Sequence, residues 1–338
     1  MPPGQETGHA PFTWADLIEG FSAELGSLAA VALHLAERRE FKEGAESVER
    51  GLRRLRDRGM GDGGVWGQRV LRVFGLPASV TDRVRWMGQY HTRFTDLPAS
   101  LCAELLRPWD RPPVSESPAR VWVLLGRANL ALRARVDATP LLEQASLLQA
   151  QAEVAARVEW ALVMAFVVSR RDPDAARRAL AQAEAGLGDD ALDAADRACL
   201  FARWIDQVAY PLNRPGSGAA HHAAAADLYR RIPDEGPLFA RSRRANGLGW
   251  SLLQLGDRSA AEAEARLSVR LAGDAGSLRM RAMALNLLAE VTEGAEAADA
   301  HDRALGIARG LEDEALRVRF GGGDQGAVAS SIADRSRP

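Results

Sequence analysis

The residues that could do chemistry through charge are most concentrated in an arginine-rich segment near the N-terminus. Between Arg50 and Arg72 the chain has seven arginines and two aspartates, a local net charge of +5. Such an excess could neutralise nucleic-acid phosphates, and the guanidinium groups could also form bidentate hydrogen bonds with guanine edges. The candidate DNA-binding residues share one predicted helix; they are Arg50, Arg53, Arg54 and Arg56. Against this hypothesis, Glu46 and Glu49 lie on the same helix, and a basic helix is often only a solvated face.

The motifs of catalysis and of metal binding are absent from the sequence. None of the six histidines lies in an HExxH motif, and there is no CxxC, GxSxG or GxxxxGK[ST] pattern. The segment GGGDQG at residues 321–326 matches GxGxxG, but it follows a predicted helix and only twelve residues remain after it. A dinucleotide-binding fold therefore cannot form there. We expect no catalytic residue, no cofactor and no metal, and hence a protein that is not an enzyme. A scattered active site in the aromatic-rich N-terminal region stays open as an alternative.

Composition favours a soluble protein with a sizeable core. The chain has 338 residues, of which 47% are hydrophobic, and a formal net charge of -2. Its two cysteines could form at most one disulfide, which is too few to cross-link a fold of this size. We therefore expect the protein to lie in the reducing cytoplasm. The first residues lack the basic and apolar regions of a signal peptide. The most apolar stretch, Trp160 to Val168, is about half the length that a bilayer requires, so we expect no membrane association.

The elements that must position the arginines are predicted to be helices. FSAELGSLAAVALHLAERR (residues 21–39) predicts one helix, and ESVERGLRRLRDRG (residues 46–59) predicts another that ends at Gly59. A glycine-rich loop, GMGDGGVWG, follows. This order is loosely similar to a helix-turn-helix with a wing, which implies DNA binding through residues 12–75. The connection from Glu37 to Ala45 is, however, longer and more charged than a tight turn.

Aromatic residues distinguish the rest of the N-terminal region. The segment from Arg85 to Pro98 combines Trp86, Tyr90, His91 and Phe94 with arginines. It could be a peptide pocket or a stacking platform, but we favour a core that covers the exposed end of a repeat array. RPPVSESP (residues 111–118) predicts a short non-helical boundary.

A pattern with a period near 40 residues runs through the second half of the chain. Gly126 and Gly249 are 123 residues apart, which is three steps of 41. Within residues 243–272, Leu248, Leu252 and Leu255 have helical spacing, Gly256-Asp257 interrupt the helix, and Ser259 is the expected cap of the next one. The small residues Ala261, Ala265 and Ser268 would let the second helix pack closely against the first. Comparable pairs are predicted in four other segments: residues 120–146, 158–185 (with Asp172 as cap and Pro173 at the first helical position), 191–232 and 279–309.

These segments resemble tetratricopeptide (TPR) repeats. Gly249, Gly256 and Ala261 match the small-residue positions of that family, and Leu248 and Leu252 match its large apolar ones. The period is longer than the usual 34 residues, and the terminal proline is mostly missing. An unrelated helical bundle rich in alanine is the alternative. The expected fold is all-α: a helical N-terminal domain, then a TPR-like α-solenoid of about five helix pairs, with a further helix at Glu312–Phe320.

The resemblance also implies where a partner would bind. In TPR proteins the first helix of each pair lines a concave groove, and the positions three before and one after the small residue face it. Those positions are Asn246 and Trp250 in one repeat and Asn286 and Glu290 in the next. An asparagine amide can donate to and accept from a peptide backbone, and arginines could bind a carboxylate. The arginines proposed for this role are Arg120, Arg127 and Arg243.

The sequence thus predicts four parts: a disordered N-terminus (residues 1–11), an aromatic-rich helical domain (12–115), a TPR-like domain (116–320) and a disordered tail (321–338). It favours a non-catalytic scaffold that holds a protein or peptide in its groove. The alternative is a bacterial transcriptional regulator, in which the N-terminal domain binds DNA under control of the repeats.

Overall fold

The computed structural model describes residues 11–38, 42–214 and 216–321, and within these ranges the chain is helical with no strand. This confirms the predicted all-α class. The two predicted disordered segments lie outside the described residues, except for Pro11 and Gly321. The chain divides into two compact units, residues 1–88 with 103–124 and residues 89–102 with 125–338. The boundary predicted at residues 111–118 lies inside the first unit.

The first unit is built on short helices around an apolar core. Its helices are α1 (Trp14–Leu25), α2 (Leu28–Ala36), α3 (Ala45–Arg56), α4 (Gly64–Phe74) and α5 (Ala78–Gly88), with the 3-10 helices η2 (Arg107–Trp109) and η3 (Val114–Glu116). Helices α6 (Ala99–Leu106) and α7 (Arg120–Arg133) contribute residues to both units. The core is formed by Trp14, Leu17, Ile18, Val31, Leu35, Leu52 and Leu55, which are almost completely buried.

The prediction of one helix over residues 21–39 is wrong, because Gly26 and Ser27 divide it. Gly26 ends α1 with a φ of 91°, in the left-handed region that favours glycine. The Ser27 side chain then accepts a hydrogen bond from the backbone N–H of Ala30 and caps α2. The second predicted helix is found as α3, which ends at Arg56, three residues before Gly59.

Glycines in and beside the predicted glycine-rich loop pack against two tryptophans of the same unit, and the loop itself ends where α4 begins at Gly64. The Trp14 indole donates to the Gly61 carbonyl at 2.9 Å. A side chain at Gly63 or Gly67 would collide with the Trp14 ring, and one at Gly51 would collide with Trp66. These glycines therefore permit close packing at this loop.

The second unit contains the remaining helices. They are α8 (Thr139–Ser146), α9 (Val154–Val168), α10 (Pro173–Leu187), α11 (Ala194–Ala209), α12 (Ala219–Arg230), α13 (Leu238–Gln254), α14 (Arg258–Asp274), α15 (Leu278–Val291), α16 (Gly294–Gly310) and α17 (Glu314–Phe320), with η1 (Arg93–Asp96) and η4 (Tyr210–Asn213). Two helices lie in each segment where the sequence predicts a pair, and α17 lies close to the predicted final helix.

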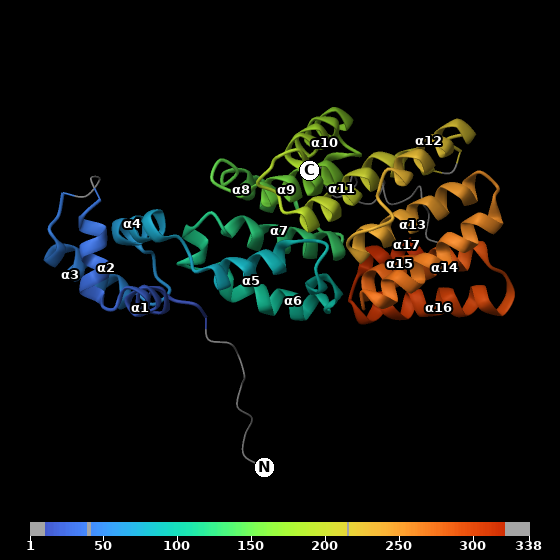
Figure 1. Cartoon of the computed structure of the whole chain (residues 1–338). Helices are drawn as coiled ribbons and strands as arrows, with labels where there is room; N and C mark the ends of the chain where they lie inside the picture. The colour runs from blue at the N-terminus through green and yellow to red at the C-terminus, as the bar shows by residue number, and fades with distance from the viewer. Residues whose placement is uncertain (1–10, 39–41, 215, 322–338) are drawn as a thin grey trace, which may run out of the picture. The chain divides into compact units, whose positions relative to one another are not determined.

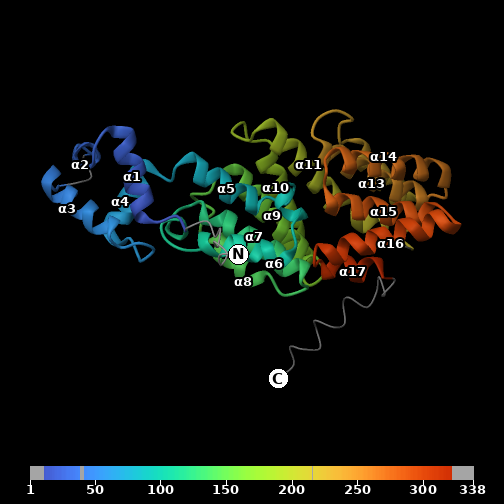
Figure 2. The same ribbon diagram turned by 90° about the horizontal axis from the view of Figure 1, so that it is seen from below.

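Helices that follow one another in this unit pack side by side. The closest neighbours are α9 with α10, α13 with α14, α14 with α15, and α15 with α16, as Figures 1 and 2 show for the orange and red helices.

The N-terminal caps of α10 and α14 are formed by residues directly before each helix. Asp172 caps α10 with Pro173 in its first turn, as predicted. The cap of α14 is Asp257 rather than the predicted Ser259. Gly256, which has a φ of 84°, ends the turn directly before Asp257, so α14 begins two residues earlier than predicted.

Small residues permit these close contacts. Ala261, Ala265 and Ser268 of α14 are fully buried, as expected for a helix that lies tightly against α13. Gly249 lies so close to α15 that an added Cβ would be 2.7 Å from Leu287 Cδ2. An added Cβ at Gly247 would overlap the ring of Tyr229 on α12. Both glycines thus mark positions in α13 that accept no side chain without a shift in a neighbour.

Candidate functional site

The most unusual polar arrangement in the second unit surrounds the hydroxyl group of Tyr90. The side chains of Arg243 (Nη2) and Arg279 (Nε) both donate to the Tyr90 oxygen, each at 3.1 Å. Arg203 lies over the face of the ring, with its Cζ atom 4.5 Å from the ring centre. These arginines belong to α11, α13 and α15. One phenol is thus surrounded by three guanidinium groups.

A carboxylate on a neighbouring segment pairs with each of these arginines. Arg243 Nη1 donates to Asp206 Oδ2 at 2.6 Å, and the other oxygen of Asp206 accepts from the Tyr229 hydroxyl at 2.9 Å. Arg203 forms an ion pair with the fully buried Glu159 of α9. Because an unpaired charge in such a place would be costly, these pairs are what makes the buried arginines tolerable.

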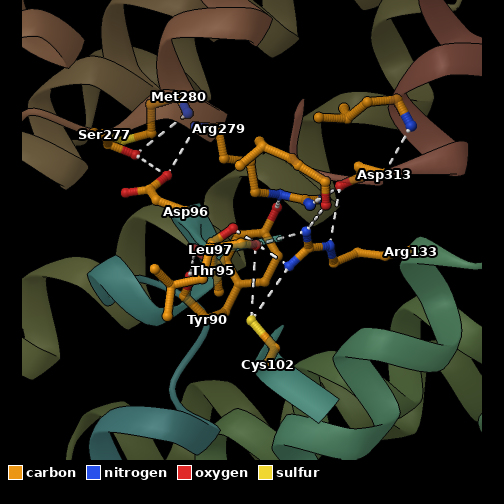
Figure 3. A network of polar contacts seen from close by, with 12 residues as sticks. Tyr90, Thr95, Asp96, Leu97, Cys102, Arg133, Ser277, Arg279, Met280 and Asp313 are labelled. Atoms are coloured by element: carbon orange, nitrogen blue, oxygen red, sulfur yellow. Dashed lines mark hydrogen bonds and ion pairs between the residues drawn. The ribbon is translucent and has the colours of Figure 1, made fainter. Parts of the chain in front are cut away.

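Arg279 and Arg133 share the single carboxylate of Asp313. Arg279 Nη1 donates to Asp313 Oδ2, and Arg133 Nε lies 3.7 Å from the same oxygen (Figure 3). Arg133 also donates to the Leu97 carbonyl at 2.9 Å and to the Leu311 carbonyl. Asp313 in turn caps α17 through the backbone N–H of Leu316. Two cations therefore have one buried acid between them.

Asp96 fixes the beginning of α15 beside this network. Its Oδ1 atom accepts from the Ser277 hydroxyl at 3.0 Å and from the backbone N–H of Arg279 at 2.8 Å, while its Oδ2 accepts from Arg93 Nε at 2.9 Å (Figure 3 shows the first two). Both oxygens of this carboxylate are therefore engaged. The arrangement orients the first turn of α15, which carries Arg279.

The electrostatics of the site favour negative charge at the Tyr90 oxygen. Burial alone opposes ionisation of the phenol, but the charges of Arg279, Arg243 and Arg203 outweigh it and lower the pKa of Tyr90 from 10.0 to about 8. Burial, followed by the charge of Arg279, also lowers the pKa of the Arg133 guanidinium. The positive charge of Arg279 contributes to both shifts.

A cavity of about 310 Å³ opens beside this phenol. Its polar lining includes Tyr90, His91, Arg243, Arg279 and Ser277, and its apolar wall includes Leu238, Phe239, Met280 and Met283. The His91 side chain is 10% exposed, with its Nε2 atom 3.3 Å from Asp196 and its Nδ1 atom buried without a hydrogen-bond partner among the described residues. The volume is at the lower end of the range for small-molecule sites.

The predicted groove residues occupy different environments. Arg243 lies in the Tyr90 site. Asn246 is 9% exposed, and its amide donates to the Met283 carbonyl at 3.3 Å; Asn286 is 8% exposed. Both asparagines are thus largely buried, and their role in a groove stays a prediction. Trp250 is half-buried against the C-terminal core, whereas Glu290 is exposed.

The remaining predicted residues are not part of this site. Arg127 is exposed on α7, and Arg120, in the first unit, pairs with Asp110 at 3.1 Å. The four arginines of α3 are exposed, while Val48, Leu52 and Leu55 form its buried face. Arg53 pairs with Glu49 at 2.6 Å, and Arg56 lies 3.8 Å from Asp57.

Sequence reasoning placed Tyr90 in an aromatic segment and Arg243 in a groove, but it missed Arg203 and Arg279. A signal for both was present, because Arg203, Arg243 and Arg279 recur at intervals of 40 and 36 residues, close to the repeat period. What the sequence could not show is that Tyr90, which precedes the repeats, reaches all three.

Comparison with protein-family models, with curated proteins and with solved structures gives no match to this chain. The described residues bring together no group of three or more His, Cys, Asp or Glu side chains that could hold a metal ion. Every helix in the described ranges is too short or too polar to cross a bilayer. The proposals below therefore rest on the geometry of this chain alone.

Proposed function

We propose that this protein is a non-catalytic binding scaffold whose TPR-like helix pairs hold a protein or peptide partner. The observation that carries the proposal is the succession of paired helices, each packed through small residues such as Gly249 and Ala261. Such an array presents the first helices of successive pairs along one continuous surface. The convergence of Arg203, Arg243 and Arg279 on Tyr90 supports it, because these side chains come from three of those first helices.

A displayed library of random peptides, selected on the full chain, tests the proposal. Selected peptides should share a motif and should bind the Glu290→Arg variant at least about fivefold more weakly, because a charge at an interface alters the encounter and the complex. Glu184→Arg is the matched control, since Glu184 is also exposed but lies on α10, the second helix of its predicted pair. A library that yields no common motif, or two variants with the same effect, would contradict the scaffold.

A regulator that binds DNA through the first unit is the second candidate. The observation in its favour is the exposed arginine face of α3, on which neither Arg50 nor Arg54 forms an ion pair within the described residues. Helix α2 packs against α3, as two helices of a DNA-binding unit would. Random duplex DNA across a salt series tests this with the full chain.

The measured quantity in the DNA experiment is the slope of log K against log salt concentration. If Arg50 and Arg54 contact phosphates, replacing both with alanine should reduce the dependence of log K on log salt by about two. The exposed pair Arg303 and Arg309 of α16 provides a control double variant. Absence of binding at low salt would exclude the regulator, and an equal loss in the control would show nonspecific attraction instead.

A further inference from the structure

The hydroxyl group of Tyr90 has an unused donor. Its oxygen already accepts two hydrogen bonds, from Arg243 and Arg279, while its own proton has no acceptor among the described residues. A phenol can both donate and accept. The hydroxyl proton is therefore available to a ligand in the adjoining cavity, which Tyr90 lines.

The arginines at this cavity also have N–H groups that form no hydrogen bond within the described residues. A guanidinium group carries five N–H donors and no acceptor. The side chains of Arg243 and Arg279 each use two N–H groups within the described residues, toward Tyr90 and toward Asp206 or Asp313. The one carboxylate that lines the cavity, Asp96, has both oxygens engaged. The polar lining of the cavity is thus rich in hydrogen-bond donors.

The charge at this polar lining is also incompletely balanced. Asp313 serves both Arg133 and Arg279, so these two cations share one negative charge. An anion beside Arg279 would meet a preformed set of donors, and charge-assisted hydrogen bonds from arginine are among the stronger ones in proteins. The lowered pKa of Tyr90 reports the same excess of positive charge.

The cavity has a partly apolar lining. Leu238, Phe239, Met280 and Met283 line it, and the Phe239 ring lies edge-on to Tyr90 with 6.4 Å between ring centres. A ligand that matches both the donors and the apolar residues has one anionic acceptor group joined to a small apolar body. The volume of about 310 Å³ limits that body to a short aliphatic chain or a single aromatic ring.

We propose that the cavity between Tyr90, Arg243, Arg279 and Phe239 binds a monocarboxylate with a small apolar body. One carboxylate oxygen accepts from the Tyr90 hydroxyl, the arginines supply further donors, and the apolar body packs on Phe239. Two sources share this chemistry: a free carboxylic acid and the C-terminal residue of a peptide. The inference rests on the proposed binding function, because it names the group that one ligand must carry.

Calorimetric titration of the full chain tests the chemistry with paired probes. The first pair is 4-phenylbutyrate and 4-phenylbutyramide; the second is N-acetyl-Ala-Ala-Phe with a free carboxylate or a carboxamide at its C-terminus. In each pair that binds, the acid should bind at least about tenfold more tightly than the amide, because the amide lacks the charge that strengthens the hydrogen bonds. Equal affinities, or no binding of either acid at millimolar concentration, would overturn the proposal.

Two tyrosine variants test whether the ligand binds in this cavity. Tyr90→Phe keeps the ring and removes the donor, so the affinity for 4-phenylbutyrate should fall at least about tenfold. Tyr210→Phe makes the same change at an exposed tyrosine and should leave the affinity unchanged. An unchanged affinity in Tyr90→Phe overturns the proposal.

The two probe pairs separate this inference from the scaffold. If library-selected peptides bind the chain equally well as carboxylates and as carboxamides, the scaffold stands and the carboxylate cavity does not. If 4-phenylbutyrate binds and no peptide does, the cavity stands with a free acid as its ligand, and the peptide scaffold fails. Tighter binding of the peptide acid identifies the C-terminus as the source.

Discussion

Replacing Gly247 with alanine should destabilise the protein, although alanine is the better helix former. Gly247 lies inside α13, where the exchange alone would favour the helix by about 1 kcal/mol. The added methyl group, however, would lie well under 3.0 Å from three ring atoms of Tyr229. Tyr229 is 2% exposed, so its ring has little room to retreat.

The size of the destabilisation follows from the cost of overpacking the core and from the strain on the hydrogen bond of Tyr229. Overpacking a core costs about 1–3 kcal/mol. A shift of the ring would also strain the 2.9 Å hydrogen bond from Tyr229 to Asp206, and a buried hydrogen bond to a charged group contributes about 1.5–3 kcal/mol. Subtracting the gain in helix propensity leaves a net loss of about 3 kcal/mol in the free energy of unfolding.

Gly306→Ala is the matched control. Gly306 is an exposed residue inside α16, and a Cβ added there meets no atom within 4 Å among the described residues. This variant should be stabilised by about 0.5–1 kcal/mol. Urea unfolding followed by circular dichroism measures both. If the two variants have the same midpoint within error, the close approach of α13 to Tyr229 is not a feature of the folded protein.

Three further predictions concern the buried polar groups. In an ultraviolet titration, Tyr90 should ionise near pH 8, so the spectral step there should vanish in Tyr90→Phe. Because its folded pKa lies below its unfolded value of about 10, its ionisation stabilises the fold fully above pH 10, and this contribution is lost as the pH falls through 8. Burial raises the pKa of the Cys199 thiol to about 12. Burial also raises the pKa of the Cys102 thiol, so neither cysteine should react with Ellman's reagent at pH 8 until the protein is unfolded. Asp313→Asn should lower the free energy of unfolding by about 3–5 kcal/mol, because it leaves the two arginines that share this carboxylate without their acid; a midpoint equal to that of the wild type would contradict the network.

The helices could be predicted from the sequence because their signals are local. Apolar spacing such as that of Leu248 and Leu252 and caps such as Asp172 act within one or two turns. The errors are also local. One helix was predicted over residues 21–39, although Gly26 carries a positive φ that only the folded chain reveals. The family position of Asn246 predicts a groove residue, and this stays a prediction; in the structure its amide donates to the Met283 carbonyl.

The candidate site could not be predicted in the same way, because its members are joined by contacts distant in sequence. Tyr90 and Arg279 are separated by 189 residues, and Arg133 and Asp313 by a similar interval. A lone tyrosine in an aromatic segment gives no sign that three arginines surround it. The intervals between those arginines were visible, but on a helical surface an arginine is most often solvated.

Stability alone is a poor explanation for this network. A buried ion pair commonly contributes no more than well-packed apolar residues of the same size would, since desolvation offsets the attraction between the charges. Four arginines and three acids are nevertheless joined by these ion pairs in the second unit: Arg133, Arg203, Arg243, Arg279, Glu159, Asp206 and Asp313. Arginines from α11, α13 and α15 meet at one phenol, so a change at that oxygen acts on three helix pairs together. A ligand anion beside Tyr90 would therefore couple occupancy of the cavity to the packing of these helices, which apolar residues at the same positions could not do.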